Sequence, residues 1–430
     1  MSRHTRRGFL KRLTGMVGAQ AAAPYVITSS ALGGAGSVPA SERITMGILG
    51  AGPRGTYVMG HFLIQKGVQW LAVSDCRTAR RDAAKRRVDQ HNRNADCAAY
   101  DDFRQLLARA DIDAVLIAAG DRWHALMSIL AAKAGKDIYC EKPITLTIAE
   151  GRALAEAIQR YGTVYQAGHQ RRSVDSYRFQ VEAARSGMIG RVHTILCQMW
   201  ESGTCRPEAP RPVPKGFNYD MWLGPTPYHP YTNARVHRWN DFWDTGAGPL
   251  IGMGCHYADI AQWGRHSDDT GPIAYEGQAL FAPESFTEVP VSGEVRCTYA
   301  DGVKLILRSK GAFAERFIRF IGSEGWVQVD DHTNLITAEP ASILKARSVS
   351  ARSWAHTGDH VQDFLRCVKT RQRTVCDAES AHRATTICHA VNICLRLGRS
   401  LKWDPKAERF LNDPQADGMI SRAMRPPWRL

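Results

Sequence analysis

Ile44-Thr-Met-Gly-Ile-Leu-Gly-Ala-Gly-Pro-Arg-Gly55 is the stretch of the sequence that decides the fold. Its apolar first half predicts a buried strand, and residues 56–66 after it predict a helix. Between them, Gly50, Gly52 and Gly55 have the spacing G-x-G-x-x-G. Glycine-rich turns are common, but a turn with this spacing between a strand and a helix predicts a dinucleotide-binding site. A turn that uses its glycines for geometry alone is the weaker alternative.

Each residue of this turn has a physical role in holding a pyrophosphate. Gly50 allows the tight turn, Gly52 lets the backbone approach the phosphates, and Gly55 lets helix and strand pack closely. The helix that follows offers free N–H groups and the positive end of its dipole to an anion. Pro53 and Arg54 lie within the same motif, so we include them among the predicted cofactor-binding residues.

Asp75 stands twenty residues after Gly55, at the end of a second apolar run, residues 70–74. An acid at this distance accepts hydrogen bonds from the adenosine ribose, and its charge repels the 2′-phosphate of NADP. We therefore expect NAD as the cofactor. NADP is the alternative, because three arginines beyond Asp75 either bind that phosphate or form a solvated helix face: Arg77, Arg80 and Arg81.

The composition predicts a globular protein of two domains. The chain has 430 residues, of which 44% are hydrophobic and 23% charged. Its net charge is +14, and the five Lys and Arg among residues 1–40 leave +9 for the remainder. No basic stripe interleaved with aromatic residues is present, which argues against nucleic acid as a partner. The eleven scattered cysteines form no C-x-x-C pair, so we predict no metal site and leave their pairing open.

The first residues resemble a twin-arginine export signal. Arg6-Arg7 precede Phe9-Leu10 and a moderately apolar segment, residues 13–23. Small-residue cleavage patterns follow, at Ala19-Gln-Ala21 or before Ser41. The alternative is a basic tail without a targeting role. The resemblance implies a periplasmic protein that meets the twin-arginine translocation machinery, a route that carries folded proteins.

Strands and helices alternate beyond Asp75. Residues 113–119 and 137–140 predict buried strands, with a helix at residues 124–134 between them, which implies β-α-β units in a doubly wound parallel sheet. The second of these strands runs directly into Glu141-Lys142-Pro143, which places Lys142 at the end of the sheet where ligands bind. A lysine there can orient a substrate hydroxyl, although a plain surface lysine is the alternative.

Alternating apolar residues in the second half of the chain predict further strands, and Asp301-Gly302 predicts a hairpin turn. The predicted strands cover residues 192–200, 273–281, 291–299, 303–309, 316–321 and 326–329. Helices are expected at residues 147–161, 359–370 and 380–397.

Several motifs occur in a specific order along the chain. After the glycine-rich turn and Asp75 come Asp121-x-x-His124 and Glu141-Lys142-Pro143. Downstream lie Gly168-His-Gln-Arg-Arg172, Gly187-Met-Ile-Gly190, Trp222-Leu-Gly-Pro225, Gly254-Cys-His-Tyr-Ala-Asp259, Cys376-Asp-Ala-Glu379, His382 and Trp403-Asp-Pro405. Each is weak alone. In this order they resemble the Gfo/Idh/MocA family, which includes glucose–fructose oxidoreductase and inositol dehydrogenase, and the resemblance runs from Thr45 nearly to the C-terminus.

The resemblance implies a Rossmann domain followed by an α/β domain with a large open, mostly antiparallel sheet, which agrees with the predicted strands. We place the signal and linker at residues 1–40, the Rossmann domain at residues 41–162 and the α/β substrate domain at residues 163–430. Such sheets often pair between subunits in the family, which implies a homo-oligomer formed through the C-terminal sheet.

The resemblance also implies the site. It makes Lys142 and His256 the catalytic pair, which hold the substrate hydroxyl and take its proton. The implied cofactor-binding residues are Gly50, Gly52, Pro53, Arg54, Gly55, Asp75, Asp121, His124, Glu141, Lys142 and Gln170. The polar candidates for the sugar are His169, Arg171, Arg172, Tyr257, Arg235 and His237, with Trp239 and Trp243 as candidates for stacking on it.

One position departs from the family. Many members carry an aspartate four residues before the histidine, where this chain has Gly252. The carboxylate that would orient His256 or relay its proton is therefore missing, and Asp244, Asp259 or the substrate itself are the alternatives. Because of this departure, a non-catalytic protein that keeps the fold and binds a ligand is a further alternative.

We expect an exported NAD(P)-dependent oxidoreductase that acts on a sugar or sugar derivative. Free nicotinamide cofactor is scarce outside the cytoplasm, so we expect a tightly bound cofactor that is regenerated within each catalytic cycle. A second substrate can re-oxidise it, as in glucose–fructose relatives. The alternative is an NAD-dependent glycoside hydrolase that uses transient oxidation at a sugar C3, elimination, hydration and re-reduction.

Overall fold

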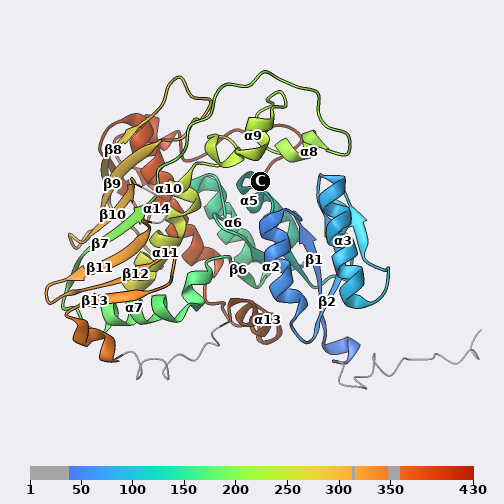
Figure 1. Cartoon of the computed structure of the whole chain (residues 1–430), viewed down its shortest axis with the longest axis horizontal. Helices are drawn as coiled ribbons and strands as arrows, with labels where there is room; N and C mark the ends of the chain where they lie inside the picture. Colours follow the sequence, from blue (N-terminus) through green and yellow to red (C-terminus); the bar gives the residue numbers. More distant parts are fainter. Residues whose placement is uncertain (1–37, 312–314, 347–358) are drawn as a thin grey trace, which may run out of the picture. The chain divides into compact units, whose positions relative to one another are not determined.

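A computed structural model describes residues 38–311, 315–346 and 359–430 (Figure 1). The predicted twin-arginine segment lies outside these residues and stays a prediction. The chain divides into two compact units, Met1–Arg43 and Ile44–Leu430. In the first unit the described residues form one short 3-10 helix, η2 (Ala40–Glu42). The second unit holds both sheets of the protein.

The first sheet is parallel and has six strands in the order β3-β2-β1-β4-β5-β6. This order confirms the predicted doubly wound sheet. The strands are β1 (Ile44–Leu49), β2 (Val68–Ser74), β3 (Ala98–Tyr100), β4 (Ala114–Ile117), β5 (Asp137–Cys140) and β6 (Tyr165–Ala167).

Helices cover both faces of this sheet, because successive strand residues point to opposite sides. Ile48 of β1 packs into an apolar core with α2 (Pro53–Leu63), α3 (Thr78–Asn92) and α13 (His360–Thr370). Its neighbour Leu49 packs into a second core with α4 (Phe103–Leu107), α5 (Asp121–Lys133) and α6 (Ile148–Tyr161). Both faces are therefore buried, as expected for a parallel sheet.

The predicted division between the domains needs two corrections. The boundary after residue 162 falls before β6, which adds a sixth strand to the first sheet. Helix α13, which the predicted division includes in the second domain, packs against the first sheet. Its Phe364 meets Phe62 and Tyr139 edge to face, with ring centroids 6.0 and 5.9 Å apart. Apolar burial on the first sheet decides this placement, and local sequence periodicity does not reveal it.

The second sheet has nine strands in the order β13-β12-β11-β7-β10-β9-β8-β14-β15. Its one parallel pair is β7 with β10, and the other pairs are antiparallel, which confirms the mostly antiparallel sheet. The strands are β7 (Val192–Met199), β8 (Ala274–Leu280), β9 (Ser292–Thr298), β10 (Lys304–Ser309), β11 (Phe317–Gly322), β12 (Trp326–Asp330), β13 (Ile336–Glu339), β14 (Leu401–Asp404) and β15 (Arg409–Phe410).

One face of the second sheet is buried under helices. In β11, for example, Ile318 and Phe320 are fully buried whereas Phe317 and Arg319 are half-buried. The same core includes residues of α7 (Asp175–Arg185), α11 (Gly254–Gly264) and α14 (Ala378–Leu397). The other face is more exposed, and its pairing with a second subunit stays a prediction. No helix in the described part of the chain is long and apolar enough to cross a membrane.

Short elements connect the two sheets and shape the site. They are η3 (Gln170–Ser173), α8 (Tyr219–Leu223), α9 (Asn233–His237), η4 (Trp239–Asp241) and α10 (Pro249–Gly252). Two more lie at the edge of the second sheet, η5 (Ala341–Ala346) and α15 (Pro414–Asp417).

Candidate active site

The glycine-rich turn has the geometry that the sequence predicts. Gly50 has a φ of +94°, and a Cβ there would lie 2.6 Å from the backbone nitrogen of Ala119. A Cβ on Gly55 would lie 2.2 Å from the carbonyl oxygen of Gly50, so a side chain would separate α2 from β1. A Cβ on Gly52 would meet only the Arg80 guanidinium, at 3.3 Å. The backbone at Gly52 is thus open on its cavity side, as an approaching phosphate requires.

Asp75 connects this turn to the end of the neighbouring strand. One carboxylate oxygen accepts a hydrogen bond from the Ala51 N–H at 2.8 Å, and the other accepts one from the Arg77 N–H at 2.8 Å. Burial raises the pKa of Asp75. Asp75, Gly50 and Gly52 line a cavity of about 410 Å³, and we call it the smaller cavity. Each carboxylate oxygen keeps a further lone pair for a ribose hydroxyl.

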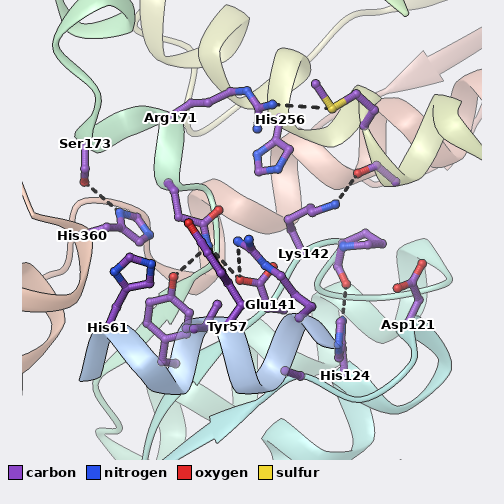
Figure 2. A pocket seen from close by; sticks show the side chains of 18 of the residues that line it. Tyr57, His61, Asp121, His124, Glu141, Lys142, Arg171, Ser173, His256 and His360 are labelled. Carbon is purple, nitrogen blue, oxygen red and sulfur yellow. Dashed lines mark hydrogen bonds and ion pairs between the residues drawn. The ribbon is translucent and has the colours of Figure 1, made fainter. Parts of the chain in front are cut away.

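A second cavity of about 870 Å³, the larger cavity, adjoins the smaller one (Figure 2). Arg54, Ala118, Ala119 and Trp239 line both, so the two form one continuous site. The larger cavity lies between the carboxyl ends of β4 and β5 and the segment that contains α10 and α11. Its volume is in the range of small-molecule binding sites.

The larger cavity brings Lys142 and His256 together from the two halves of the second unit (Figure 2). The Lys142 Nζ donates a hydrogen bond to the carbonyl oxygen of Gly252 at 2.7 Å. His256 is 4% exposed, and its Nδ1 has no partner among the described residues. Burial, together with the nearby Arg171 and Lys142 charges, lowers the pKa of His256 well below its usual value. The imidazole is therefore neutral and open to accept a hydrogen bond.

Glu141 has one bonded and one free carboxylate oxygen. Its Oε1 accepts hydrogen bonds from Arg54 Nη2 at 2.9 Å and from Gln170 Nε2 at 2.8 Å. Its Oε2 is buried without a partner in the described structure. Burial alone would raise the pKa of Glu141, but the Arg54 and Lys142 charges hold it below its usual value. The carboxylate is thus ionised and positioned to accept one more donor.

Asp121 and His124 both line the larger cavity from α5. The Asp121 Oδ2 is buried without a partner among the described atoms, and burial raises the pKa of Asp121 to about 7. The two His124 ring nitrogens lie 2.6 Å from the Pro143 carbonyl oxygen and 3.0 Å from that of Ala119. His124 therefore braces two loops of the site, and Asp121 is the residue of this pair that is free to bind a ligand.

These observations fit a bound dinucleotide. The glycine turn has no side chains where phosphates approach, and Asp75 faces the smaller cavity. Asp121 and Glu141 each have a buried carboxylate oxygen without a hydrogen-bond partner among the described residues. These oxygens can accept hydrogen bonds, and the ribose hydroxyls and the carboxamide of NAD are suitable donors. The residues present would hold NAD along both cavities.

The structure revises the roles of three residues expected to contact the sugar. His169, Arg172 and Tyr257 line neither cavity, and their side chains are buried. Arg172 is occupied by the carboxylates of Asp259 and Asp268, at 2.7 Å each. The ion pairs hold Arg172 outside both cavities, and His169 and Tyr257 are buried outside them as well.

Arg171 does line the larger cavity, but it forms a bidentate ion pair with Asp331, at 2.5 and 2.7 Å. Arg235 is likewise held by Asp244 at 2.9 Å and by Glu288 at 3.2 Å, and it lines neither cavity. His237 lines the smaller cavity, on the cofactor side. Of the six polar candidates, only Arg171 is therefore placed where a sugar could meet it.

The two tryptophans also differ in placement. Trp239 lines both cavities and stays a candidate for stacking. Trp243 does not, because the guanidinium groups of Arg396 and Arg422 lie 3.8 and 3.7 Å from its ring centroid. Two cations so close to one ring occupy both of its faces.

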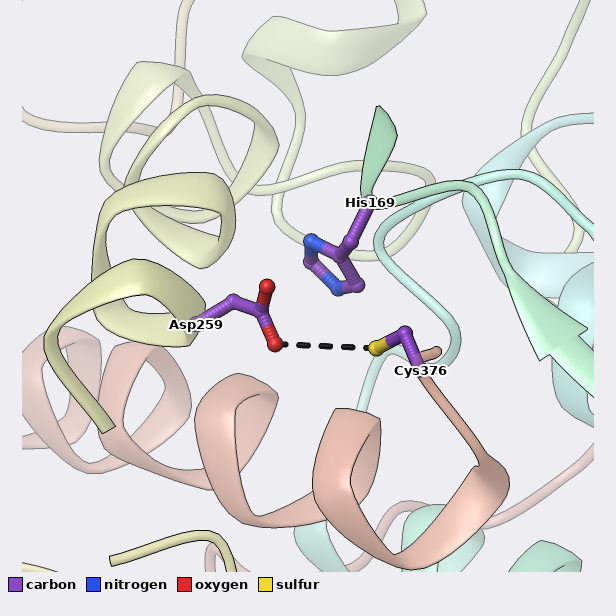
Figure 3. Close-up of side chains that lie close together, drawn as sticks. All are labelled: His169, Asp259 and Cys376. Atoms are coloured by element: carbon purple, nitrogen blue, oxygen red, sulfur yellow. Dashed lines mark hydrogen bonds between the residues drawn. The ribbon is translucent and has the colours of Figure 1, made fainter. Parts of the chain in front are cut away.

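His169, Asp259 and Cys376 bring three potential metal-ligating atoms within 4.8 Å of one another (Figure 3). The Asp259 carboxylate already accepts hydrogen bonds from Arg172 Nε and Nη2 at 2.7 to 3.0 Å. A metal ion would have to share this carboxylate with a fixed positive charge a few ångströms away, which is unfavourable. We assign no metal to the cluster.

Several residues that line the larger cavity were not predicted from sequence motifs. Asn240, Asp331, Asp359 and His360 line the larger cavity although no motif spacing marks them. Neither aspartate proposed in place of the missing carboxylate reaches the site, because Asp244 and Asp259 line neither cavity and are held by arginines.

Residues 216–223 form a strap across the smaller cavity, and sequence patterns did not reveal it. The Thr78 N–H donates to the Gly216 carbonyl at 2.9 Å, and the Asn218 N–H donates to the Cys76 carbonyl at 2.8 Å. At the other end, Arg122 Nε donates to the Trp222 carbonyl at 2.6 Å. Met221 and Trp222 line the smaller cavity, so the strap forms part of its wall.

Residues near the C-terminus brace the strap from outside. The Arg425 guanidinium donates to the carbonyl oxygens of Asp220 and Gly224 at 3.0 Å each, and it pairs with the Asp220 carboxylate at 2.5 Å. Trp428 packs against Trp123 with ring centroids 4.8 Å apart. Neither Arg425 nor Trp428 lines a cavity, so their contribution to the strap is separate from any contact with a ligand.

Comparisons with known proteins agree with this geometry. The Gfo/Idh/MocA family model described as an oxidoreductase family with an NAD-binding Rossmann fold matches residues 44–169. The companion model, described as the C-terminal alpha/beta domain of the oxidoreductase family, matches residues 196–430.

Individual relatives match more narrowly. Myo-inositol 2-dehydrogenase of Thermotoga maritima is 27% identical over 168 residues, which are 39% of this chain and 47% of that enzyme. Glycosyl hydrolase family 109 protein 1 of Shewanella sp. (strain ANA-3) is 33% identical over 126 residues, which are 28% of this chain and 27% of that protein. The chain thus spans less than half the length of these two relatives.

A solved structure shares the fold over most of the chain. The WlbA dehydrogenase from Bordetella pertussis, in complex with NADH and UDP-GlcNAcA, is 15% identical with a TM-score of 0.65. The match covers 84% of this chain and 98% of that one.

Proposed function

We propose that this chain, which belongs to the Gfo/Idh/MocA family of oxidoreductases, is an exported enzyme that oxidises or reduces a carbinol of a sugar or sugar derivative with tightly held NAD. One observation carries the proposal. The glycine-rich turn and Asp75 open into a cavity that continues, past Arg54, to Lys142 and His256. A cofactor site and a pair of groups suited to a hydroxyl proton therefore share one wall.

Bound NAD would supply the hydride acceptor, and the chain's own residues would handle the hydroxyl. The Lys142 ammonium has three N–H donors, of which one is used by Gly252, so two remain for a substrate oxygen. A positive charge beside that oxygen lowers the pKa of the hydroxyl. His256 is neutral and accepts the proton at a ring nitrogen.

The strap supports tight retention of the cofactor. Residues 216–223 are bonded to the turn after Asp75 and to the first turn of α5, on both sides of the smaller cavity. If a dinucleotide leaves on the strap's side of the smaller cavity, these hydrogen bonds must break first. Slow release follows from this, because each bond adds to the barrier that opening must overcome.

Export to the periplasm stays part of the proposal and rests on the twin-arginine resemblance at Arg6-Arg7. A route that carries folded proteins suits a protein that closes around its cofactor before it leaves the cytoplasm. Retention and export are thus connected, since a cofactor that cannot be exchanged outside must be regenerated in place by a second substrate. The open face of the second sheet is the proposed contact in a homo-oligomer.

A redox-neutral glycoside hydrolase is the second candidate, and the match to a glycosyl hydrolase family 109 protein favours it. In that cycle the sugar is oxidised, the aglycone is eliminated, water adds and the sugar is reduced again, so no net redox change occurs. A strapped cofactor suits this cycle equally well.

The experiment uses the exported protein purified without added cofactor. Near-ultraviolet absorbance and fluorescence would detect bound NAD(H), and a panel of p-nitrophenyl glycosides, free hexoses and inositols would then be tested without added NAD. Reduction of the bound cofactor by a free sugar supports the oxidoreductase, and aglycone release supports the hydrolase. Protein that neither carries nor binds NAD(H) would overturn both.

A further inference from the structure

We propose that Asn240 binds a substrate hydroxyl in the larger cavity, with its amide in the space that a side chain at position 252 would take. The inference rests on the proposed function and specifies the same site further. It assigns to a neutral amide, brought by a different segment of the chain, the place of the carboxylate that many family members carry.

Geometry places the amide against Gly252. A Cβ built on Gly252 would lie 3.4 Å from Asn240 Nδ2 and 3.7 Å from its Oδ1, in van der Waals contact. A carboxylate on that Cβ would extend into the space that the Asn240 amide fills. Residue 252 and residue 240 therefore compete for one position in the cavity wall.

A second glycine makes room for the same side chain. A Cβ on Gly246 would lie 2.5 Å from the Asn240 Cα and 2.9 Å from its Oδ1, closer than real contacts allow. The Asn240 carbonyl also accepts a hydrogen bond from the Gly248 N–H at 2.7 Å. The segment from Gly246 to Gly252 thus lies close around Asn240, whose backbone is held by a hydrogen bond and whose side chain lies beside Gly246 and Gly252.

The amide is not satisfied by the protein. Asn240 Oδ1 is buried, and no described residue donates a hydrogen bond to it. Buried polar atoms of structural residues are nearly always paired, so an orphan in a cavity wall indicates a group that is completed by a ligand. An amide both donates and accepts, which matches a sugar hydroxyl.

The position lies beside the reacting groups. Gly252 offers its carbonyl to Lys142 Nζ at 2.7 Å, and His256 follows four residues later in the same segment. Asn240 shares the larger cavity with both. A hydroxyl next to the reacting carbinol would therefore meet a neutral partner, and proton transfer is left to His256.

The test compares Asn240→Ala with Asn233→Ala, a control in the same segment that lines neither cavity. Binding of the panel sugars to the NAD-loaded protein would be measured by calorimetry, and KM and kcat by turnover. We expect Asn240→Ala to weaken binding and raise KM about tenfold, the size of one lost hydrogen bond, with bound NAD and thermal stability unchanged. The control should match the wild type.

An exchange variant tests the shared position directly. Gly252→Asp alone should crowd Asn240 and weaken sugar binding, whereas Gly252→Asp combined with Asn240→Gly should restore it. The double variant should also add an acidic limb to the pH profile, because a carboxylate now stands where an amide stood. Unchanged binding in Asn240→Ala overturns the inference alone. Failure of the NAD-loaded wild type to bind any panel sugar overturns the proposed function as well.

Discussion

The side-chain nitrogen of Lys142 lies 2.7 Å from the carbonyl oxygen of Gly252, and this contact joins the end of β5 to the segment that carries His256. The lysine comes from the first sheet and the histidine from the helix that packs under the second. This hydrogen bond thus connects the two segments that carry the proposed chemistry. Substitutions on either side should therefore affect the same step.

Lys142→Met and His256→Ala should each reduce turnover by about 100-fold or more, the range typical of lost acid–base groups. Bound NAD should remain, because the glycine turn, Asp75 and the strap are untouched. Steady-state kinetics and the absorbance of the purified protein check both points. Unchanged biological activity in both variants would favour a ligand-binding protein without chemistry.

Gly50→Ala should abolish NAD binding, and it should destabilise the fold by about 1–3 kcal/mol because the residue has a positive φ. The new methyl group would also collide with the backbone at Ala119, 2.6 Å away. Gly271→Ala is the matched control, since no atom lies within 4 Å of a Cβ there. NADH fluorescence and thermal unfolding would be compared, and normal binding by Gly50→Ala would contradict the predicted role of the turn.

NAD affinity should rise with pH until about pH 7 and then level off. Burial raises the pKa of Asp121 to about 7, so its carboxyl group is neutral below that pH. A ribose hydroxyl that donates to the carboxylate favours the ionised form, so binding releases a proton at low pH and becomes tighter as the pH rises. Asp121→Asn should flatten this dependence. An affinity that falls with rising pH would show that Asp121 donates as a neutral acid.

Arg425→Ala should speed the release of NADH by about tenfold, because it removes the hydrogen bonds that brace the strap without touching either cavity. Arg429→Ala, four residues later and exposed, is the control. Stopped-flow displacement of bound NADH measures the rate. Equal rates in the two variants would mean that the strap does not govern retention.

Arg6→Lys with Arg7→Lys should keep the protein in the cytoplasm, because the twin-arginine route reads the arginine pair and not charge alone. Cell fractionation followed by detection of the protein checks this, with Arg3→Lys as the control. Periplasmic accumulation of the double variant would contradict the proposed route.

Local patterns were enough to predict most of the fold. The strand Asp137–Cys140 followed from a short apolar run, and the helix at residues 147–161 was also predicted. The structure adds a capping box of Thr147 and Glu150 at the start of α6. Pairing between distant segments was not encoded locally. The sixth strand, β6, has three residues, too few for a periodic signal, and its place depends on the edge left open by β5.

The residues of the site also fall into two groups, those that local sequence patterns predict and those that depend on packing between distant segments. Gly50, Asp75 and Lys142 lie where short spacings and strand ends place them. His169 and Arg172 share a motif with Arg171, yet they point behind the wall, because a motif gives no direction to its side chains. Asn240 reaches the cavity only through the packing of Gly246 and Gly252, which no linear spacing expresses.

The packing of α13 on the first sheet limits how this protein can be recombined with its relatives. Phe364 completes a core with Phe62 and Tyr139, although almost two hundred residues of the second sheet and its helices intervene in the sequence. A chimera with a single crossover after β6 would separate these partners and pair the N-terminal part with a foreign helix. Functional chimeras should therefore need two crossovers, so that α13 travels with the sheet that it covers.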